Sequence, residues 1–149
     1  MDAFYEQEEI TPEELRAKIF ESLKNYDDKS FLEMFALYLG KVQLLEFALK
    51  KLLVDLYGIE LDTLERKTLG QTRRLLENKG LRTDYLTLLK SVVDDRNHAA
   101  HEMLASHALL GSFEVEFSER FQQNELLSAV FKLEQSIILF DYFQRNNAW

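Results

Sequence analysis

The sequence predicts an all-α protein, an up-and-down bundle of four to five helices. Apolar residues recur at spacings of three and four along several long stretches, which is the period of a helix with one buried face. Five glycines and one proline among 149 residues leave those stretches largely uninterrupted. We expect a single domain over residues 1–149, because a chain of this length suits one hydrophobic core better than two.

Capping signals mark the first two helices. The TPEE stretch at 11–14 has the pattern of a helix cap, a first-turn proline and a capping box, and predicts a helix to about residue 25. Ser30 with Glu33 repeats the capping pattern, and the second helix is expected to end near Gly58. Apolar residues cover more than one face of this second helix, which favours a central helix or one shared with another subunit.

Three further helices are predicted in the second half of the chain. Residues 66–78 form a short basic helix, another helix begins near residue 83 or 84, and the last spans about 118–145. Residues 113–117 alternate apolar and acidic side chains, which is the period of a strand. We interpret them as an extended loop pinned by aromatic side chains; a strand paired with its copy in a second subunit is the alternative.

Composition narrows the possible functions. Eighteen basic and 26 acidic side chains give a net charge of -8, so any contact with nucleic acid is expected to be local. The lack of cysteine excludes disulfides, thiolate metal sites and cysteine nucleophiles. Apolar runs are short and residues 1–20 do not resemble a signal peptide, so we expect a cytoplasmic protein without a membrane partner. The acidic residues 1–10 are the segment expected to be disordered.

The stretch DDRNHAAHEML, residues 94–104, places an arginine on the apolar side of the fourth helix. At about 100° per residue, Arg96 falls in the middle of the apolar arc, with no carboxylate at i-4 or i+4. A guanidinium buried there alone would be strongly destabilising, so we expect an acid such as Glu46, helix carbonyls or an anion to satisfy it. Ala99 and Ala100 leave space beside the charge, either a hollow or a closely packed backbone.

The position of His101 suggests a second subunit. On a straight helix His101 lies about 140° around from Arg96, so the two side chains meet only if long side chains converge or if a second copy faces the first across a twofold axis. The spacing R-x4-H, with Asn97 directly after the arginine, resembles the R-x4-6-H signature of HEPN-domain proteins. The long amphipathic helices predicted around the motif also agree with this family. Met103 departs from the tyrosine that one branch of the family has at this position.

The resemblance implies a bundle of four or five helices that dimerises so that two motifs line one cleft. It also implies metal-independent endoribonuclease activity without a cofactor, commonly in toxins of toxin-antitoxin systems or in antiviral phage defence. Carried over to this sequence, Arg96 and His101 would be the catalytic pair and Asn97 the supporting polar group. His98 occupies a variable position and inherits no role.

The chemistry of these side chains fits RNA cleavage. A metal-free reaction needs a base for the 2'-hydroxyl proton, an acid for the leaving oxygen and positive charge for the phosphate. Histidine can act as acid or base near neutral pH, and the arginine fork matches phosphate oxygens. We therefore assign Arg96 to phosphate stabilisation, His101 to proton transfer and Asn97 to orienting either of them.

Basic side chains gather between residues 66 and 82. Arg73, Arg74, Lys79 and Arg82 are assigned to RNA binding, and a solvated helix face is the alternative. The expected partners are an RNA substrate and a second copy of the chain, with the second and fourth helices at the interface. An antitoxin or regulatory protein is a further candidate partner.

Three rival interpretations remain open. His98, His101 and Glu102 lie close together, but the order H-x-x-H-E matches no zinc-hydrolase pattern, and no metal is expected. The chain could instead be a non-catalytic HEPN-like helical dimer that binds protein, nucleotide or RNA, or a plain dimerisation protein whose Arg96 pairs with an acid. His107 is interpreted as a loop residue.

Overall fold

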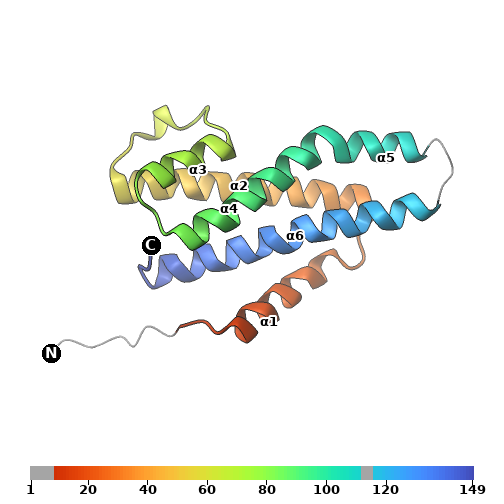
Figure 1. The fold of residues 1–149 in the computed structure, drawn as a ribbon, viewed down its shortest axis with the longest axis horizontal. Helices are drawn as coiled ribbons and strands as arrows, with labels where there is room; N and C mark the ends of the chain where they lie inside the picture. Colours follow the sequence, from red (N-terminus) through yellow and green to blue (C-terminus); the bar gives the residue numbers. More distant parts are fainter. Residues whose placement is uncertain (1–8, 112–115) are drawn as a thin grey trace.

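The structure, a computed structural model, describes residues 9–111 and 116–149, with the side chains of 106, 109–111 and 116–121 outside the description. All regular structure in these ranges is helical, which confirms the predicted fold class (Figure 1). The main helices are α1 (Pro12–Leu23), α2 (Phe31–Tyr57), α3 (Leu69–Asn78), α4 (Thr83–His98), α5 (Leu104–Gly111) and α6 (Glu116–Arg145). Short 3₁₀ turns follow α1 at Lys24–Tyr26 and precede α3 at Leu61–Thr63, and a π-helix, Ala99–Met103, joins α4 to α5.

The predicted disorder at 1–10 falls mostly on residues 1–8, which lie outside the described residues. Residues 113–115 of the segment predicted to be an extended loop also lie outside the described residues. Its last two residues, 116 and 117, belong to α6. The final helix therefore begins two residues earlier than the sequence pattern predicted. None of the helices in the described part of the chain is both long and apolar enough to cross a bilayer.

Local hydrogen bonds start the helices where the sequence predicted, with one correction. The side chains of Thr11 and Ser30 each accept a hydrogen bond from the backbone N–H three residues later, at 3.2 Å in both cases. At α3 the Thr68 hydroxyl and the Gln71 amide form a complete capping box. This box fixes the start of α3 at Leu69, three residues later than predicted.

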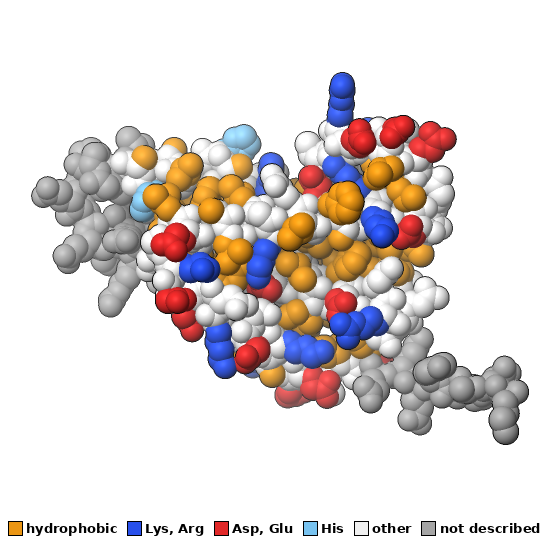
Figure 2. Space-filling view, turned by 180° about the vertical axis from the view of Figure 1, so that it is seen from behind, with side chains coloured by type: hydrophobic (Ala, Val, Ile, Leu, Met, Phe, Trp, Pro, Cys, Tyr) orange, Lys and Arg blue, Asp and Glu red, His pale blue; other side chains and the backbone are white. Residues whose placement is uncertain are grey.

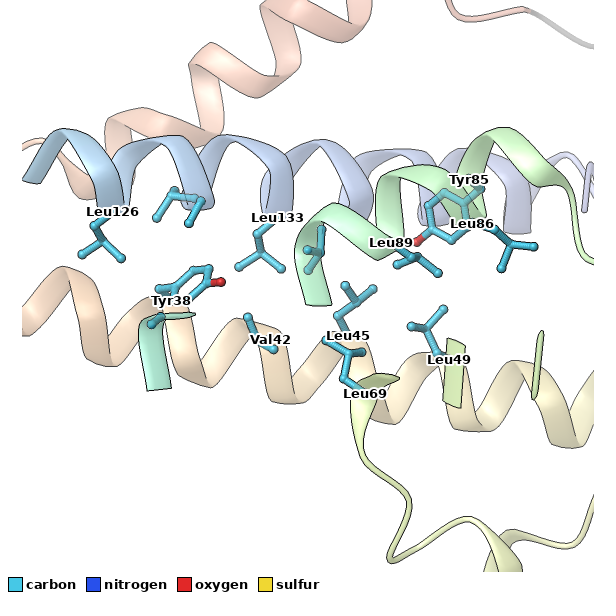
Figure 3. Close-up of a cluster of buried hydrophobic side chains, with 14 of the residues drawn as sticks. Tyr38, Val42, Leu45, Leu49, Leu69, Tyr85, Leu86, Leu89, Leu126 and Leu133 are labelled. Carbon is cyan, nitrogen blue, oxygen red and sulfur yellow. The ribbon is translucent and has the colours of Figure 1, made fainter. Parts of the chain in front are cut away.

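Helices α1, α2, α4 and α6 run alternately in opposite directions, and the short α3 runs in the same direction as α2 (Figure 1). Figure 1 shows α2 and α6 lying alongside each other, with α4 crossing them in the opposite direction and α1 packed on the outer side of α6. The core lies between α2, α4 and α6, and α3 adds Leu69 to it (Figure 3). Buried leucines such as Leu49 and Leu133 are fully enclosed, so truncating either to alanine should cost about 2–5 kcal/mol.

One carboxylate is enclosed in this core. Glu134 of α6 is almost fully buried, and its Oε1 accepts a hydrogen bond of 2.8 Å from the Tyr26 hydroxyl and pairs with the Lys41 ammonium. The Lys41 ammonium also lies 5.0 Å from the centre of the Tyr26 ring. Because the charge of Glu134 has both partners, it joins the 3₁₀ turn Lys24–Tyr26 to α2 and α6.

Candidate functional site

The motif lies where the fourth helix changes its winding. Residues Ala99–Met103 form a π-helix between α4 and α5, so the backbone continues without a break from Thr83 to Gly111. Hydrogen bonds in a π-helix join residues i and i+5, so each residue advances by less than the 100° of an α-helix. His101 therefore lies nearer to the face of Arg96 than it would on a straight helix. Such π segments are frequent at functional sites.

Arg96 occupies a core position of α4 without being enclosed. Val92 before it and Ala99 after it are buried, whereas Arg96 is half-buried and hydrogen-bonds the Asn97 side chain in an exposed contact of 3.4 Å. The predicted burial of this charge is therefore wrong, and the charge does not require the compensating acid or carbonyls that we expected, because the long side chain carries its guanidinium toward the surface. The suggested partner Glu46 pairs with Lys50 instead, at 3.5 Å.

The guanidinium of Arg96 forms no ion pair with any of the described side chains. Asn97 and His101 are both exposed, and His101 has no hydrogen bond or ion pair among the described residues. Ala99 is fully buried and Ala100 is exposed, so the expected space beside Arg96 opens to solvent at Ala100. The three residues assigned to catalysis thus lie on one surface-accessible segment.

Asp95, the residue before Arg96, forms an ion pair with α6. The Asp95 carboxylate of α4 is half-buried and lies 3.4 Å from the Lys132 ammonium of α6. Burial raises the pKa of the Tyr38 hydroxyl, the charge of Asp95 raises it further, and Arg96 opposes this rise. The Tyr38 hydroxyl is buried without a hydrogen-bond partner among the described residues. Because Asp95 pairs with Lys132, Arg96 does not form the ion pair with this neighbouring carboxylate.

His98 joins the π-helix to α6. Its Nδ1 lies 2.9 Å from a Glu102 carboxylate oxygen and its Nε2 contacts the Glu125 carboxylate. Both contacts can be hydrogen bonds only if the ring carries two protons, because a neutral imidazole has a single N–H. The sequence assigned His98 no role; its i,i+4 spacing to Glu102 was a signal for that contact, but Glu125 is distant in sequence.

The rival metal site is not assembled. Both ring nitrogens of His98 face carboxylates, and no group of three potential metal ligands gathers within the described ranges.

His107 is also placed differently from its prediction. It lies on α5, stacks on the Phe31 ring at 4.4 Å between centres and contacts Gln122 at 2.9 Å, so it is a packing residue rather than a loop residue.

The basic residues assigned to RNA binding fall into two kinds. Arg73 donates to the Leu86 carbonyl at 2.9 Å and to Glu77 at 2.8 Å, and Arg82 is held by several groups at the start of α4. Arg74 and Lys79 are exposed and have no partner among the described side chains. Arg82 lies about 21 Å from Arg96 along the axis of α4, so it does not lie beside the motif.

Comparison of the chain with protein-family models, with curated proteins and with solved structures found no match. The case for a function therefore depends on the motif and on the geometry around it.

Proposed function

We propose that the chain is a metal-independent endoribonuclease of HEPN type that cleaves RNA at a cleft shared by two subunits. The observation that carries this proposal is an arginine at a core position of α4 whose guanidinium has no acidic partner among the described side chains. An exposed histidine follows it on a π-helix. A fold that needed Arg96 for stability would pair its charge, whereas an anionic ligand requires that the charge stay available.

The reaction uses His101 from both copies, together with Arg96 and Asn97. A base removes the proton of the ribose 2'-hydroxyl, whose oxygen forms a bond to phosphorus while the bond to the 5'-oxygen breaks and that oxygen takes a proton from an acid. His101 serves as the base, and the His101 of a second copy serves as the acid. Arg96 stabilises the charge that gathers on the phosphate oxygens. Asn97 accepts a hydrogen bond from Arg96 and so helps to orient it.

Exposed leucines beside the motif support the shared cleft. Leu104 follows the π-helix directly and is 44% exposed, and Leu127 lies on α6 two residues from Glu125, which contacts His98. Figure 2 shows further apolar side chains next to the histidines at this end of the molecule, and a contiguous exposed apolar patch is typical of an association surface. We propose that these two leucines border the interface between copies. This differs from the predicted use of the second helix.

The test incubates the purified protein with mixed RNA in the presence of a chelator, alongside His101→Ala. We expect the wild type to leave 2',3'-cyclic phosphate ends and the variant to be inactive while retaining its circular dichroism spectrum. His98→Ala is the matched control, because this histidine has structural partners and no assigned catalytic role. Cleavage that persists in His101→Ala, or that requires added metal, would contradict the proposal.

A non-catalytic, HEPN-like binding module is the second candidate. Leu44 and Phe47 on α2 are 70% and 60% exposed, and the net charge of -8 suits a protein partner better than a polyanion. A toxin regulated by an antitoxin would also offer such a surface. A well-folded wild type that fails to cleave RNA would favour this function.

A further inference from the structure

A groove between α3 and α4 lies on the same helix as the motif. It has a volume of about 360 Å³ and is lined mainly by Gly70, Arg73, Arg74, Glu77, Lys90 and Asp94. Lys90 was not among the basic residues that the sequence assigned to RNA binding. The groove is partly enclosed and partly open to solvent, so a ligand can reach the side chains that line it.

The charges in the groove divide into a structural pair and available cations. Arg73 and Glu77 form an ion pair of 2.8 Å, and Arg73 also donates to the Leu86 carbonyl, so this pair joins α3 to α4. Arg74 and Lys90 are exposed, and neither has an acidic partner among the described side chains. Asp94 also lines the groove, one helical turn after Lys90 on α4. The groove therefore holds two available cations and one available carboxylate.

The first turn of α3 adds to this positive charge. A side-chain carbon at Gly70 would lie 3.4 Å from a Val93 methyl group, so the start of α3 approaches α4 closely. Gly70 is the second residue of α3, where backbone N–H groups give the helix end a partial positive charge. The helix end and the two cations thus act on the same hollow.

An exposed stripe of α4 connects the groove to the motif. Lys90, Asp94 and Asn97 recur at i, i+4 and i+7 and are all exposed. Lys90 and Asn97 are separated by about 10 Å along the helix axis. This distance is short enough for one nucleic-acid strand to contact both with phosphates a few nucleotides apart.

We propose that the groove between α3 and α4 binds a backbone phosphate of single-stranded RNA through Arg74 and Lys90, beside the phosphate that Arg96 contacts. The nature of the ligand rests on the proposed function. Arg82 takes no part because the fold already uses its donors, and Lys79 lies at the opposite end of α3 from Gly70. Asp94 weakens binding and limits the groove to a strand held by other contacts as well.

The test measures binding of a labelled single-stranded RNA to the His101→Ala protein by fluorescence anisotropy as salt is raised. Arg74→Gln combined with Lys90→Gln should weaken binding about tenfold, because it removes charged contacts to phosphate. The slope of log Kd against log salt should fall by about 1.4, which corresponds to two lost phosphate contacts on a single strand. Lys18→Gln with Lys51→Gln removes two exposed cations of α1 and α2 and is the matched control; it should leave the slope nearly unchanged.

Asp94→Asn should tighten RNA binding, whereas Asp55→Asn, which removes an exposed acid from α2, should not. Equal effects of the groove and control variants would overturn the assignment, and so would a failure of the His101→Ala protein to bind RNA. If inorganic pyrophosphate displaced RNA and bound as tightly as RNA does, the groove would be a site for a small phosphate ligand. That result would also overturn the proposal. The wild type could fail to cleave RNA while the groove substitutions still weaken RNA binding. That pair of results would support the groove as an RNA-binding site and reject the nuclease function.

Discussion

The two ends of α4 each carry an arginine, and the fold treats them in opposite ways. At the first end Arg82 donates to both carboxylate oxygens of Asp84, at 2.7 and 2.8 Å, and to the Ala148 carbonyl at 2.8 Å. Its guanidinium also lies 3.7 Å from the centre of the Phe143 ring. At the other end Arg96 has one long hydrogen bond, to Asn97, among the described residues.

This difference distinguishes a structural cation from an available one. Arg82 holds the C-terminal residues against α4, where Trp149 packs on Tyr85 and Phe143. The Arg82 hydrogen bond lowers the pKa of Asp84, and Asp84 raises that of Arg82. The donors of Arg96 are not used in this way, so a phosphate could take them without breaking the fold.

The largest expected effect is on activity at the Arg96 end. Arg96→Ala should lower RNA cleavage by about 10²–10³-fold, because it removes the charge that stabilises the transition state. The free energy of unfolding should change by less than about 0.5 kcal/mol, since few contacts are lost. Cleavage assays and urea denaturation measure the two quantities. A large loss of stability would place Arg96 with Arg82 as a structural residue.

At the other end the effect should fall on stability. Arg82→Ala should lower the free energy of unfolding by about 2 kcal/mol, because it removes a hydrogen bond to a carbonyl, an ion pair and a cation–π contact. Urea denaturation measures this loss, with Arg74→Ala as a control that removes an exposed arginine lacking such partners. Cleavage at a temperature where Arg82→Ala stays folded should equal that of the wild type.

Two tyrosines extend the comparison into the core. The Tyr85 hydroxyl, near Arg82, donates to the Ser136 carbonyl at 2.9 Å, whereas that of Tyr38, near Arg96, has no partner among the described residues. Tyr85→Phe should therefore cost about 1 kcal/mol of unfolding free energy and Tyr38→Phe close to nothing. Thermal unfolding of the two variants would show the contrast, and equal losses would indicate that Tyr38 has a partner.

The same tyrosines predict a loss of stability at high pH. Burial raises the pKa of Tyr85, Tyr38 and Tyr26 in the folded chain above the usual value of 10.0. Above pH 10 the unfolded chain therefore releases tyrosine protons that the folded chain keeps, so the free energy of unfolding falls as pH rises. Denaturant titrations between pH 8 and 11 measure this decline, and Tyr38→Phe should make it shallower. A decline of equal steepness in the variant would contradict the prediction.

The smallest effect concerns Asp84, which is exposed. Because Arg82 lowers the pKa of this carboxyl, its contribution to stability is present above about pH 4 and is lost as pH falls through the lowered pKa. Asp84→Asn should flatten the acid side of the stability curve by a few tenths of a kcal/mol, the size expected for an exposed pair. Asp62→Asn, at an exposed acid without a described partner, should leave that side unchanged.

The sequence predicted the helices well because their signals are local. The caps at Thr11 and Ser30 each join atoms three residues apart, and the long apolar stripes of α2 and α6 show their period directly. The start of α3 was missed by three residues because the basic residues before Thr68 were counted as part of the helix. The sequence also drew attention to Arg96, Asn97 and His101 through their spacing alone.

The state of those residues depended on contacts that no local pattern contains. Arg82 is saturated through Ala148, 66 residues away, and His98 contacts Glu125, 27 residues away. The winding of Ala99–Met103 into a π-helix changed the angle between Arg96 and His101 that a straight helix would give. Lys90 joined the groove only because α3 packs beside α4.

By itself the sequence determined that this chain is a helical bundle and that residues 96–101 are unusual, because helix period and caps are set by side chains within a few residues of one another. Only the tertiary structure decided which cations form hydrogen bonds and ion pairs within the fold and which remain available at the surface. Whether a cation has a partner depends on which residues the packing of the helices brings into contact. The distance between two residues along the chain does not show whether they are in contact.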